Sequence, residues 1–288
     1  MPQTAQIITS YGRRYIVRTT NRQTYEASTR SKRTDYACGD FVNIQIINDE
    51  QAVIESVQPR QSLLYRQDAW KSKLIAANVS QLLIVIAAEP SPSEALLQRA
   101  LIAAEAARIH PVIVINKADL PVTAALQEKL SFYGKLGYEI ITLSALGNVD
   151  ILRDKLRGET NILLGQSGMG KSTLTNALLG EAIARTQTIS AALDSGKHTT
   201  THAQLYDLDD TTQLIDSPGL QEFGLHHLAA VDLLHYFPDL KQLIGQCRFH
   251  NCTHRAEPNC ALKAAAERGE VSAERVALLQ KITDELLR

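Results

Sequence analysis

Eight residues beginning at Gly165 have the types and spacing needed to hold phosphate groups. The run GQSGMGKS (165–172) fits the pattern G-x-x-x-x-G-K-[ST], follows the apolar residues 162–164 and precedes a predicted helix over 172–179. Glycines in such a loop let backbone N–H groups surround the phosphates, and the helix N-terminus adds a positive dipole. The predicted phosphate contacts are Gly165, Gln166, Ser167, Gly168, Met169, Gly170, Lys171, Ser172 and Thr173.

A second motif, Asn116-Lys117-Ala118-Asp119, directly follows the apolar run 112–115. It is predicted to lie at the carboxyl end of a parallel strand, where ligands of α/β proteins bind. The Asp119 carboxylate can accept two N–H bonds from guanine, while adenine would leave it unpaired. Asn116 would orient the loop and the base, and the Lys117 stem would cover the ring. Ser144 and Ala145, just after residues 140–143, are predicted to contact the guanine oxygen through backbone amides.

A third motif, DSPG (216–219), follows the apolar pair Leu214-Ile215. Asp216 is predicted to hold Mg²⁺ through water, and the Gly219 N–H to contact the γ-phosphate. Lys171 would bridge β- and γ-phosphate oxygens as a catalytic group, and the Ser172 hydroxyl would ligate Mg²⁺. Together the three motifs predict binding of GTP or GDP with Mg²⁺.

The polar segment GKHTTT (196–201) supplies the remaining predicted catalytic groups. Thr200 is predicted to close on Mg²⁺ and the γ-phosphate, with Thr199 and Thr201 as open alternatives. Leu220 follows Gly219 and cannot orient an attacking water. We expect His198 to do so, with Gln221 as the alternative. Hydrolysis by the protein alone is therefore expected to be slow and to need a partner that orders these segments.

Four potential metal ligands lie within fourteen residues near the C-terminus: Cys247, Cys252, His254 and Cys260. Three thiolates and one imidazole are typical of a closed, structural zinc site. We therefore predict one structural Zn²⁺, although this spacing departs from the common C-x₂-C. His250 is an alternative to His254, and free thiols in a helical segment are the alternative to metal binding.

The elements that must position these groups fall into three predicted parts. Residues 1–72 contain short β-branched runs such as 15–18 and 41–46, which predict an OB-fold-like β-barrel that binds RNA. Residues 73–225 alternate apolar strands with helices, which predicts an α/β, doubly wound nucleotide-binding domain. Residues 226–288 are predicted to form a zinc-binding α-helical domain, with Ser272 as a helix N-cap.

Composition limits the classes of protein that this chain can be. The 288 residues carry 30 basic and 31 acidic side chains, and 44% are hydrophobic, which excludes a generally disordered chain. Seven basic residues against one acid between positions 1 and 33 hint at a polyanionic partner. No signal peptide or membrane-spanning run is visible, so we expect a cytoplasmic protein without a membrane partner, working as a monomer.

The order of the motifs is permuted. Most GTPases have the phosphate loop first, then the switch threonine, DxxG, NKxD and SAx. Here NKAD (116–119) and SAL (144–146) precede the phosphate loop, and DSPG comes last. This order predicts a circular permutation, which is tolerated because domain termini usually lie close together. It also places DSPG directly before the C-terminal segment, so nucleotide state could reposition that segment.

The permuted set, the N-terminal barrel and the Cys/Cys/His/Cys segment resemble the small-ribosomal-subunit biogenesis GTPases (RsgA, also called YjeQ) over nearly the whole chain. The stretch KLIAANVSQ (73–81) also looks like this family. The resemblance implies a GTPase that binds the maturing small subunit and its rRNA, is activated by it, and leaves after hydrolysis. It assigns the family's catalytic histidine to His198. One departure is the segment 28–34, which lacks the Cys-Arg-Gly-like run of relatives.

Two other functions fit the same motifs. One is a regulatory GTPase whose switch binds a protein. The other is an RNA-binding assembly factor that uses GTP only as a structural ligand.

Overall fold

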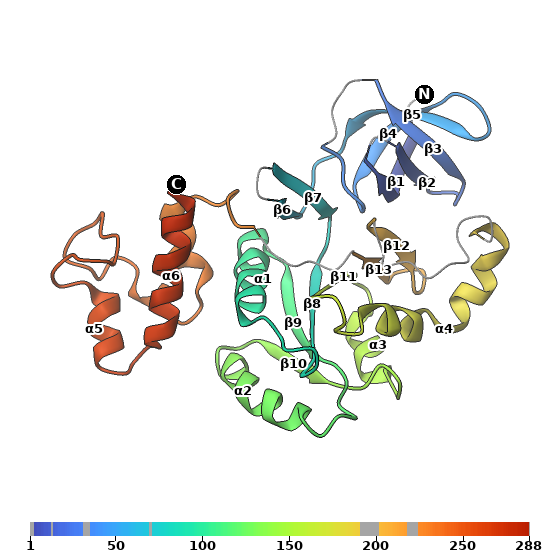
Figure 1. Cartoon of the computed structure of the whole chain (residues 1–288). Coiled ribbons are helices and arrows are strands. Elements are labelled where there is room, and N and C mark those ends of the chain that lie inside the picture. The colour runs from blue at the N-terminus through green and yellow to red at the C-terminus, as the bar shows by residue number, and fades with distance from the viewer. Residues whose placement is uncertain are drawn as a thin grey trace.

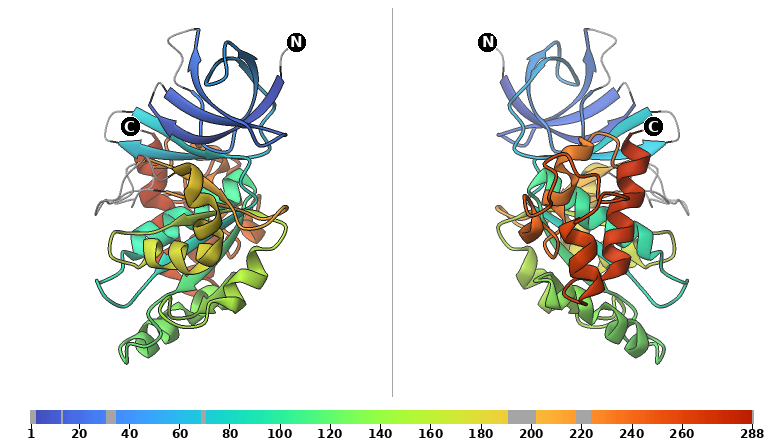
Figure 2. Two further views of the ribbon diagram at one scale, coloured as in Figure 1. Left: turned by 90° about the vertical axis from the view of Figure 1, so that its right-hand side faces the viewer. Right: turned by 90° about the vertical axis from the view of Figure 1, so that its left-hand side faces the viewer.

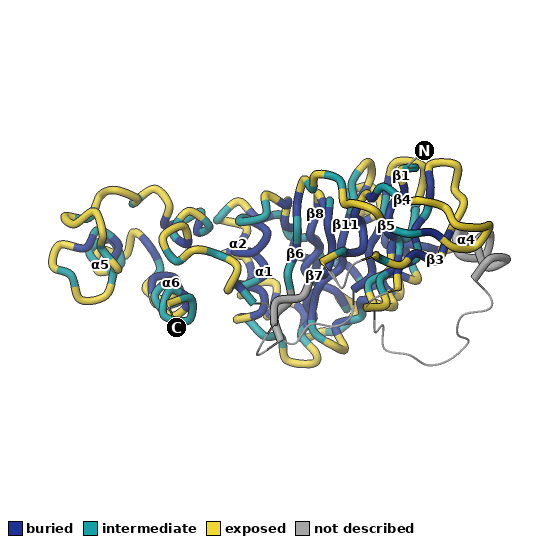
Figure 3. Tube along the Cα trace, turned by 90° about the horizontal axis from the view of Figure 1, so that it is seen from above, coloured by how far each residue is buried: buried dark blue, intermediate teal, exposed yellow. Residues whose placement is uncertain are grey.

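The chain folds into three consecutive parts, seen in the computed structural model as a barrel, a central sheet with helices, and a C-terminal helical segment (Figure 1). The structure describes residues 3–12, 14–30, 35–68, 71–190, 202–217 and 224–287. The barrel lies at one end and the C-terminal segment at the other, with the buried residues concentrated between and inside them (Figure 3). No helix of the described part is long and apolar enough to cross a membrane.

Five strands close the N-terminal barrel. They are β1 (Gln3–Tyr11), β2 (Arg14–Thr19), β3 (Thr24–Thr29), β4 (Phe41–Ile46) and β5 (Gln51–Val57). The barrel closes because β1 pairs with both β2 and β4, while β3 and β5 pair in parallel. Alternate residues such as Val17 and Ile44 point inwards and form a core of their own.

A two-stranded hairpin, β6 (Leu63–Asp68) and β7 (Lys71–Ala77), connects the barrel to the central sheet. The Ala77 N–H donates to the Cys38 carbonyl at 2.9 Å, so β7 touches the loop before β4. The two strands form a sheet of their own, separate from the barrel sheet.

The central sheet has the order β10-β9-β8-β11-β13-β12 and continues through β1 into the barrel. Its strands are β8 (Gln81–Ile86), β9 (His110–Ile115), β10 (Glu139–Thr142), β11 (Thr160–Leu164), β12 (Gln204–Asp207) and β13 (Gln213–Asp216). All pair in parallel except β12, which runs antiparallel to β13. The fully buried β8 is the apolar run expected in a sheet covered on both faces.

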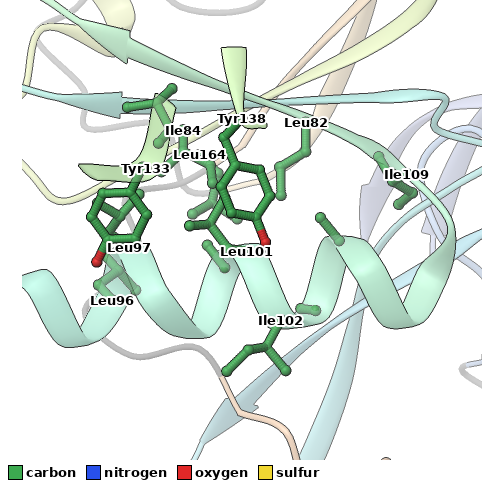
Figure 4. Packing of buried hydrophobic residues seen from close by; sticks show 14 of the residues in the cluster. Leu82, Ile84, Leu96, Leu97, Leu101, Ile102, Ile109, Tyr133, Tyr138 and Leu164 are labelled. Atoms are coloured by element: carbon green, nitrogen blue, oxygen red, sulfur yellow. The ribbon is translucent and has the colours of Figure 1, made fainter. Parts of the chain in front are cut away.

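Four helices belong to this sheet: α1 (Glu94–Ala107), α2 (Thr123–Lys135), α3 (Asp150–Leu156) and α4 (Lys171–Ser190). Two hydrophobic clusters form, one on each face of the sheet. Leu97 and Leu101 point from α1 towards the sheet, whereas Ile102 points away from it (Figure 4). Helix α1 is therefore buried on two sides.

The C-terminal segment covers the outer side of α1. It contains the 3₁₀ helices η1 (Ala230–Tyr236) and η2 (Lys241–Leu243) and the helices α5 (Ala261–Glu267) and α6 (Ala273–Leu286). Ser272 caps α6, as predicted, by accepting the Arg275 N–H. The Arg275 guanidinium is 3% exposed, donates to Asp239 at 2.8 Å and lies over the Phe237 ring. The two side views of Figure 2 show this segment beside the central helices and below the barrel.

Candidate nucleotide site and metal centre

The phosphate loop connects β11 to α4 at the carboxyl edge of the sheet, and two of its glycines are required by close packing. Gly165 has φ +156°, and a Cβ there would lie 2.3 Å from the Val85 carbonyl oxygen. Gly170 has φ +88°, and a Cβ there would lie 2.3 Å from Asn116 Nδ2. These contacts are shorter than any side chain tolerates, so the pattern's two glycines hold the loop against β8 and the NKAD motif.

Asn116 joins three of the predicted loops. Its side chain is 1% exposed, its Nδ2 donates to the Met169 carbonyl at 2.9 Å, and its Oδ1 accepts the Ala145 N–H at 2.9 Å. The phosphate loop and the SAL motif are therefore hydrogen-bonded to the same amide group. Residues separated by 53 and 29 positions are brought to one site by the parallel strands β11, β9 and β10.

Lys117 and Asp119 extend the site beyond Asn116. The Lys117 Nζ donates to the Glu89 carbonyl at 2.7 Å, which fixes its stem across the end of the loop after β8. A hydrogen bond from the Ser144 side chain, followed by one from its own backbone, lowers the pKa of the exposed Asp119. Asp119 is therefore ionised and held as an acceptor, the state that recognition of guanine N–H groups requires.

Lys171 is buried inside the loop, at the first residue of α4. Its Nζ donates to the Gly165 and Gln166 carbonyls, both at 2.8 Å. Burial lowers the pKa of Lys171, and the negative charge of Asp216 at the end of β13 partly offsets that effect. The amine is thus held at the mouth of the loop with an acidic group beside it.

Asp216 and Ser172 are the described residues predicted to serve Mg²⁺. The Asp216 side chain is 6% exposed, and the neighbouring Ser217 hydroxyl donates to the Leu163 carbonyl at 2.7 Å, which fixes the end of β13 against β11. Ser172 is exposed at the start of α4. A hydroxyl and a carboxylate near a phosphate loop are hard oxygen ligands of the kind that Mg²⁺ prefers, so these residues fit that ion.

The remaining predicted groups lie outside the described residues. They are His198, Thr199, Thr200, Thr201, Gly219, Leu220 and Gln221. Their roles stay predictions.

The sequence patterns missed one part of the site, the loop 87–93 between β8 and α1. The Ala87 N–H donates to Met169 Sδ at 3.1 Å, and the Ser93 N–H donates to Gln166 Oε1 at 2.6 Å. Its position after a parallel strand, at the ligand-binding edge of the sheet, was the one available signal. The loop matches no phosphate- or base-binding pattern.

The four predicted zinc ligands come together. The three Sγ atoms and one imidazole nitrogen lie within 4.8 Å of one another. His254 Nδ1 is 3.6 Å from Cys247 Sγ and 3.4 Å from Cys260 Sγ. A tetrahedral zinc site with bonds of about 2.3 Å to sulfur and 2.0 Å to nitrogen puts such atoms about 3.6 Å apart. The arrangement therefore fits one Zn²⁺, and the exposed His250 lies outside the cluster.

Burial tunes two of these ligands. It raises the pKa of the Cys252 thiol to about 12, with the neighbouring thiols acting in the same direction, and lowers the pKa of His254. His254 is therefore neutral near pH 7, as a metal ligand must be. A bound metal ion would displace the proton of the Cys252 thiol into solvent, because three packed thiolates are not stable without a cation.

Comparison with known proteins identifies the family to which the chain belongs. The sequence model of the RsgA GTPase family matches residues 57–226, which contain all of the nucleotide motifs. The chain belongs to the RsgA GTPase family. The "small ribosomal subunit biogenesis GTPase RsgA" of Neisseria meningitidis serogroup C is 73% identical over 286 residues, covering 99% of this chain and 93% of that protein. The RsgA protein of Nitrosospira multiformis is 45% identical, over 98% of this chain and 90% of its own length.

Solved structures support the same assignment. YjeQ from Thermotoga maritima superposes with a TM-score of 0.73 at 27% identity, covering 100% of this chain and 99% of the other. YloQ, described as a circularly permuted GTPase, superposes with a TM-score of 0.70 at 25% identity, covering 99% and 95%. The predicted fold class, a circularly permuted α/β GTPase domain with an N-terminal barrel and a C-terminal Cys₃His segment, is confirmed.

Proposed function

We propose that this RsgA-family GTPase assists maturation of the small ribosomal subunit, binding it with GTP and leaving after hydrolysis. One observation carries the proposal. Asn116 joins the phosphate loop to the SAL motif by two 2.9 Å hydrogen bonds, in the permuted order of a family whose members are named for this process. GTP hydrolysis is the activity of that family.

Among the described residues, one group binds the guanine base and another binds the phosphates. Asp119 accepts the guanine N–H groups, Lys117 covers the ring, and the Ala145 N–H is oriented towards the base by Asn116. The backbone of residues 165–173 surrounds the phosphates, and Lys171 shifts from the loop carbonyls to the β- and γ-phosphate oxygens. Bound Mg²⁺ supplies charge neutralisation, with Ser172 and Asp216 as its protein ligands.

The groups outside the described residues complete the proposal. Thr200 closes on Mg²⁺ and the γ-phosphate, the Gly219 N–H contacts the γ-phosphate, and His198 positions the attacking water. Slow turnover in isolation is part of the proposal, because Leu220 cannot orient the attacking water and the subunit completes the catalytic geometry. One Zn²⁺ held by the Cys₃His cluster shapes the C-terminal segment. We further propose that the protein works as a monomer in the cytoplasm, in contact with rRNA and not with a membrane.

The decisive experiment measures GTP hydrolysis with and without purified small subunits. We expect weak hydrolysis alone and strong stimulation by the subunit. Large subunits at the same concentration are the control and should stimulate little. Absence of stimulation would favour a protein-regulated switch. Binding without hydrolysis at saturating subunit would favour GTP as a structural ligand.

Two variants test the site itself. Ser172→Ala should lose Mg²⁺-dependent hydrolysis, because a metal ligand is removed. Asp119→Asn should mainly weaken preference for guanine over other bases, measured by competition between GTP and XTP. An unchanged preference in Asp119→Asn would disprove its role as base reader. Exposed Asp150, at the start of α3, offers Asp150→Asn as the matched control.

A further inference from the structure

The loop 87–93 touches three successive parts of the phosphate loop. The Ala87 N–H donates to Met169 Sδ, and the Pro90 ring lies 3.2 Å from the point that a Cβ on Gly168 would occupy. The Ser93 N–H donates to Gln166 Oε1 at 2.6 Å. The phosphate loop is therefore supported along its length by the connection between β8 and α1.

Gln166 accepts hydrogen bonds through both its side chain and its backbone carbonyl. Its side chain accepts from Ser93, at the start of α1. Its backbone carbonyl accepts from the Lys171 Nζ at 2.8 Å. One residue thus fixes the peptide on which the phosphate-binding lysine rests and ties that peptide to a helix. A side chain committed to Ser93 is not available to the nucleotide.

Ser93 is itself rigidly placed. Its hydroxyl accepts the Leu96 N–H at 3.2 Å as the N-cap of α1, so the donor that meets Gln166 belongs to the first fixed residue of the helix. Beyond it, α1 is buried on two sides, with Leu97 and Leu101 against the sheet and Ile102 facing away (Figure 4). A hydrogen bond to such an anchor restrains the phosphate loop more than one to a mobile loop would.

Helix α1 also packs against the C-terminal segment. Arg99 on α1 forms an ion pair with Glu285 on α6. The hydrophobic cluster around Leu101 includes Phe237 and Ile282 of the C-terminal segment. The path from the phosphate loop to the metal-binding segment therefore runs through Gln166, Ser93 and one buried helix.

We propose that the Gln166 side chain is a positioning group for GTP binding, acting through the Ser93 N–H and not by its own contact with the nucleotide. It holds the phosphate loop in its binding geometry against α1, the same helix on which the C-terminal segment is docked. This deepens the proposed function, because it gives the GTP site a fixed attachment to the metal-binding segment.

Four variants test the proposal by equilibrium titration with GTP and by steady-state hydrolysis. Gln166→Leu removes the acceptor at nearly constant volume. Ser93→Pro removes the donor, and its φ of −85° is close to what proline needs. Ser93→Ala loses the cap but keeps the N–H, so it measures the effect of the cap alone. The double variant Gln166→Leu with Ser93→Pro completes a double-mutant cycle, which tests whether the two residues act through one hydrogen bond.

Gln166→Leu and Ser93→Pro should each weaken GTP binding about five- to tenfold, the usual effect of one lost hydrogen bond. The loss should lie in KM and not in kcat, and the double variant should be no weaker than either single one. Ser93→Ala should weaken GTP binding less than Ser93→Pro does, because it keeps the N–H that Gln166 accepts. Melting temperatures are measured in parallel. A variant that is only less stable, but still folded at the assay temperature, should keep a normal KM, whereas loss of the Gln166–Ser93 bond should raise KM.

Normal GTP binding by Gln166→Leu, or effects that multiply in the double variant, would overturn the proposal. Titration with GTP alone needs no ribosomal particle. If subunits failed to stimulate the unsubstituted protein, the proposed function would fail while this test of Gln166 would still stand.

Discussion

The central GTPase domain meets its two neighbours in physically opposite ways. The barrel has a separate hydrophobic core and touches the β12–β13 hairpin through polar groups. The C-terminal segment shares one hydrophobic cluster with α1 and the sheet. The first junction is mainly polar, with only Cys38 and Ile8 of the barrel part in the shared cluster, whereas the second is mainly apolar.

The barrel junction combines the β1–β12 pairing and the Ala77–Cys38 backbone bond with ion pairs and amide contacts. Arg18 contacts Asp207 at 2.6 Å, and Arg22 contacts Asp210 at 2.7 Å. The amides of Gln6 and Gln213 donate to each other at 3.1 Å. Such contacts exchange readily for contacts with water or phosphate, and polar interfaces between domains permit relative motion.

At the C-terminal junction, Phe237 and Ile282 are fully buried in the same cluster as Leu101 of α1. Separating these surfaces would expose apolar area at about 25 cal/mol for each Å². The difference indicates that the C-terminal segment is held to α1 mainly by apolar burial, while the barrel is held to the sheet mainly by hydrogen bonds and ion pairs.

The largest expected effect is that of metal removal. Cys260→Ser, or a strong chelator, should destabilise the C-terminal segment by about 5 kcal/mol or more, because metal binding contributes folding free energy directly. Metal affinity should fall as pH falls, since the Cys252 thiol, with a metal-free pKa of about 12, must release a proton to bind. Metal content and thermal unfolding measure both. If the GTPase domain melted unchanged, the two would not share a core.

The next largest effect is expected for Phe237→Ala. Removing this fully buried ring should cost about 3–5 kcal/mol in free energy of unfolding, measured with urea, and should lower GTPase-domain stability with it. Val231→Ala, on the 3₁₀ helix that ends just before Phe237 but 85% exposed, is the control and should change stability by less than about 0.5 kcal/mol. Equal effects of the two substitutions would contradict the shared core.

A smaller effect is expected at the barrel junction. Arg18→Ala removes a half-buried ion pair and should cost about 1 kcal/mol, without changing unfolding of the C-terminal segment. Limited proteolysis between barrel and sheet should become faster. The exchanged pair Arg18→Asp with Asp207→Arg should restore resistance, whereas Arg14→Ala, whose Glu26 partner lies within the barrel, should leave cleavage unaltered.

The smallest effect is expected for Arg22→Ala. Both members of the Arg22–Asp210 pair are exposed, at 70% and 91% of their side chains, so solvent and salt screen the interaction. Its loss should change stability by less than about 0.5 kcal/mol, with no effect at 1 M salt. A loss as large as that of Arg18→Ala would mean that the junction acts as one network.

The nucleotide motifs could be predicted from the sequence because each is contiguous and its chemistry depends on local spacing. The Asn116 contacts then follow from the parallel order of the strands. The barrel junction could not be predicted, because Arg18 and Asp207 are 189 positions apart and neither belongs to a motif. Strand β12 was missed because its four residues, Gln204–Asp207, contain no β-branched residue.

The basic residues of the N-terminal part, which the sequence presented as a local excess of positive charge, are partly paired with acids in the structure. Arg14, Arg18, Arg22 and Arg30 each form an ion pair with an acidic side chain. The excess of basic residues counted along the sequence is therefore partly neutralised within the molecule. An amino-acid count cannot show this, because two of the acidic partners come from the β12–β13 hairpin.

The pairing of β1 with β12, through Thr9 and Gln204, has a consequence for handling the protein. Without the barrel, the β12 edge would lose its partner at Gln204, and an unpaired strand edge is the feature by which sheets recruit strands from other molecules. The barrel thus acts as a guard against aggregation. A protein truncated before β6 should self-associate with rising concentration, even though its nucleotide loops are intact.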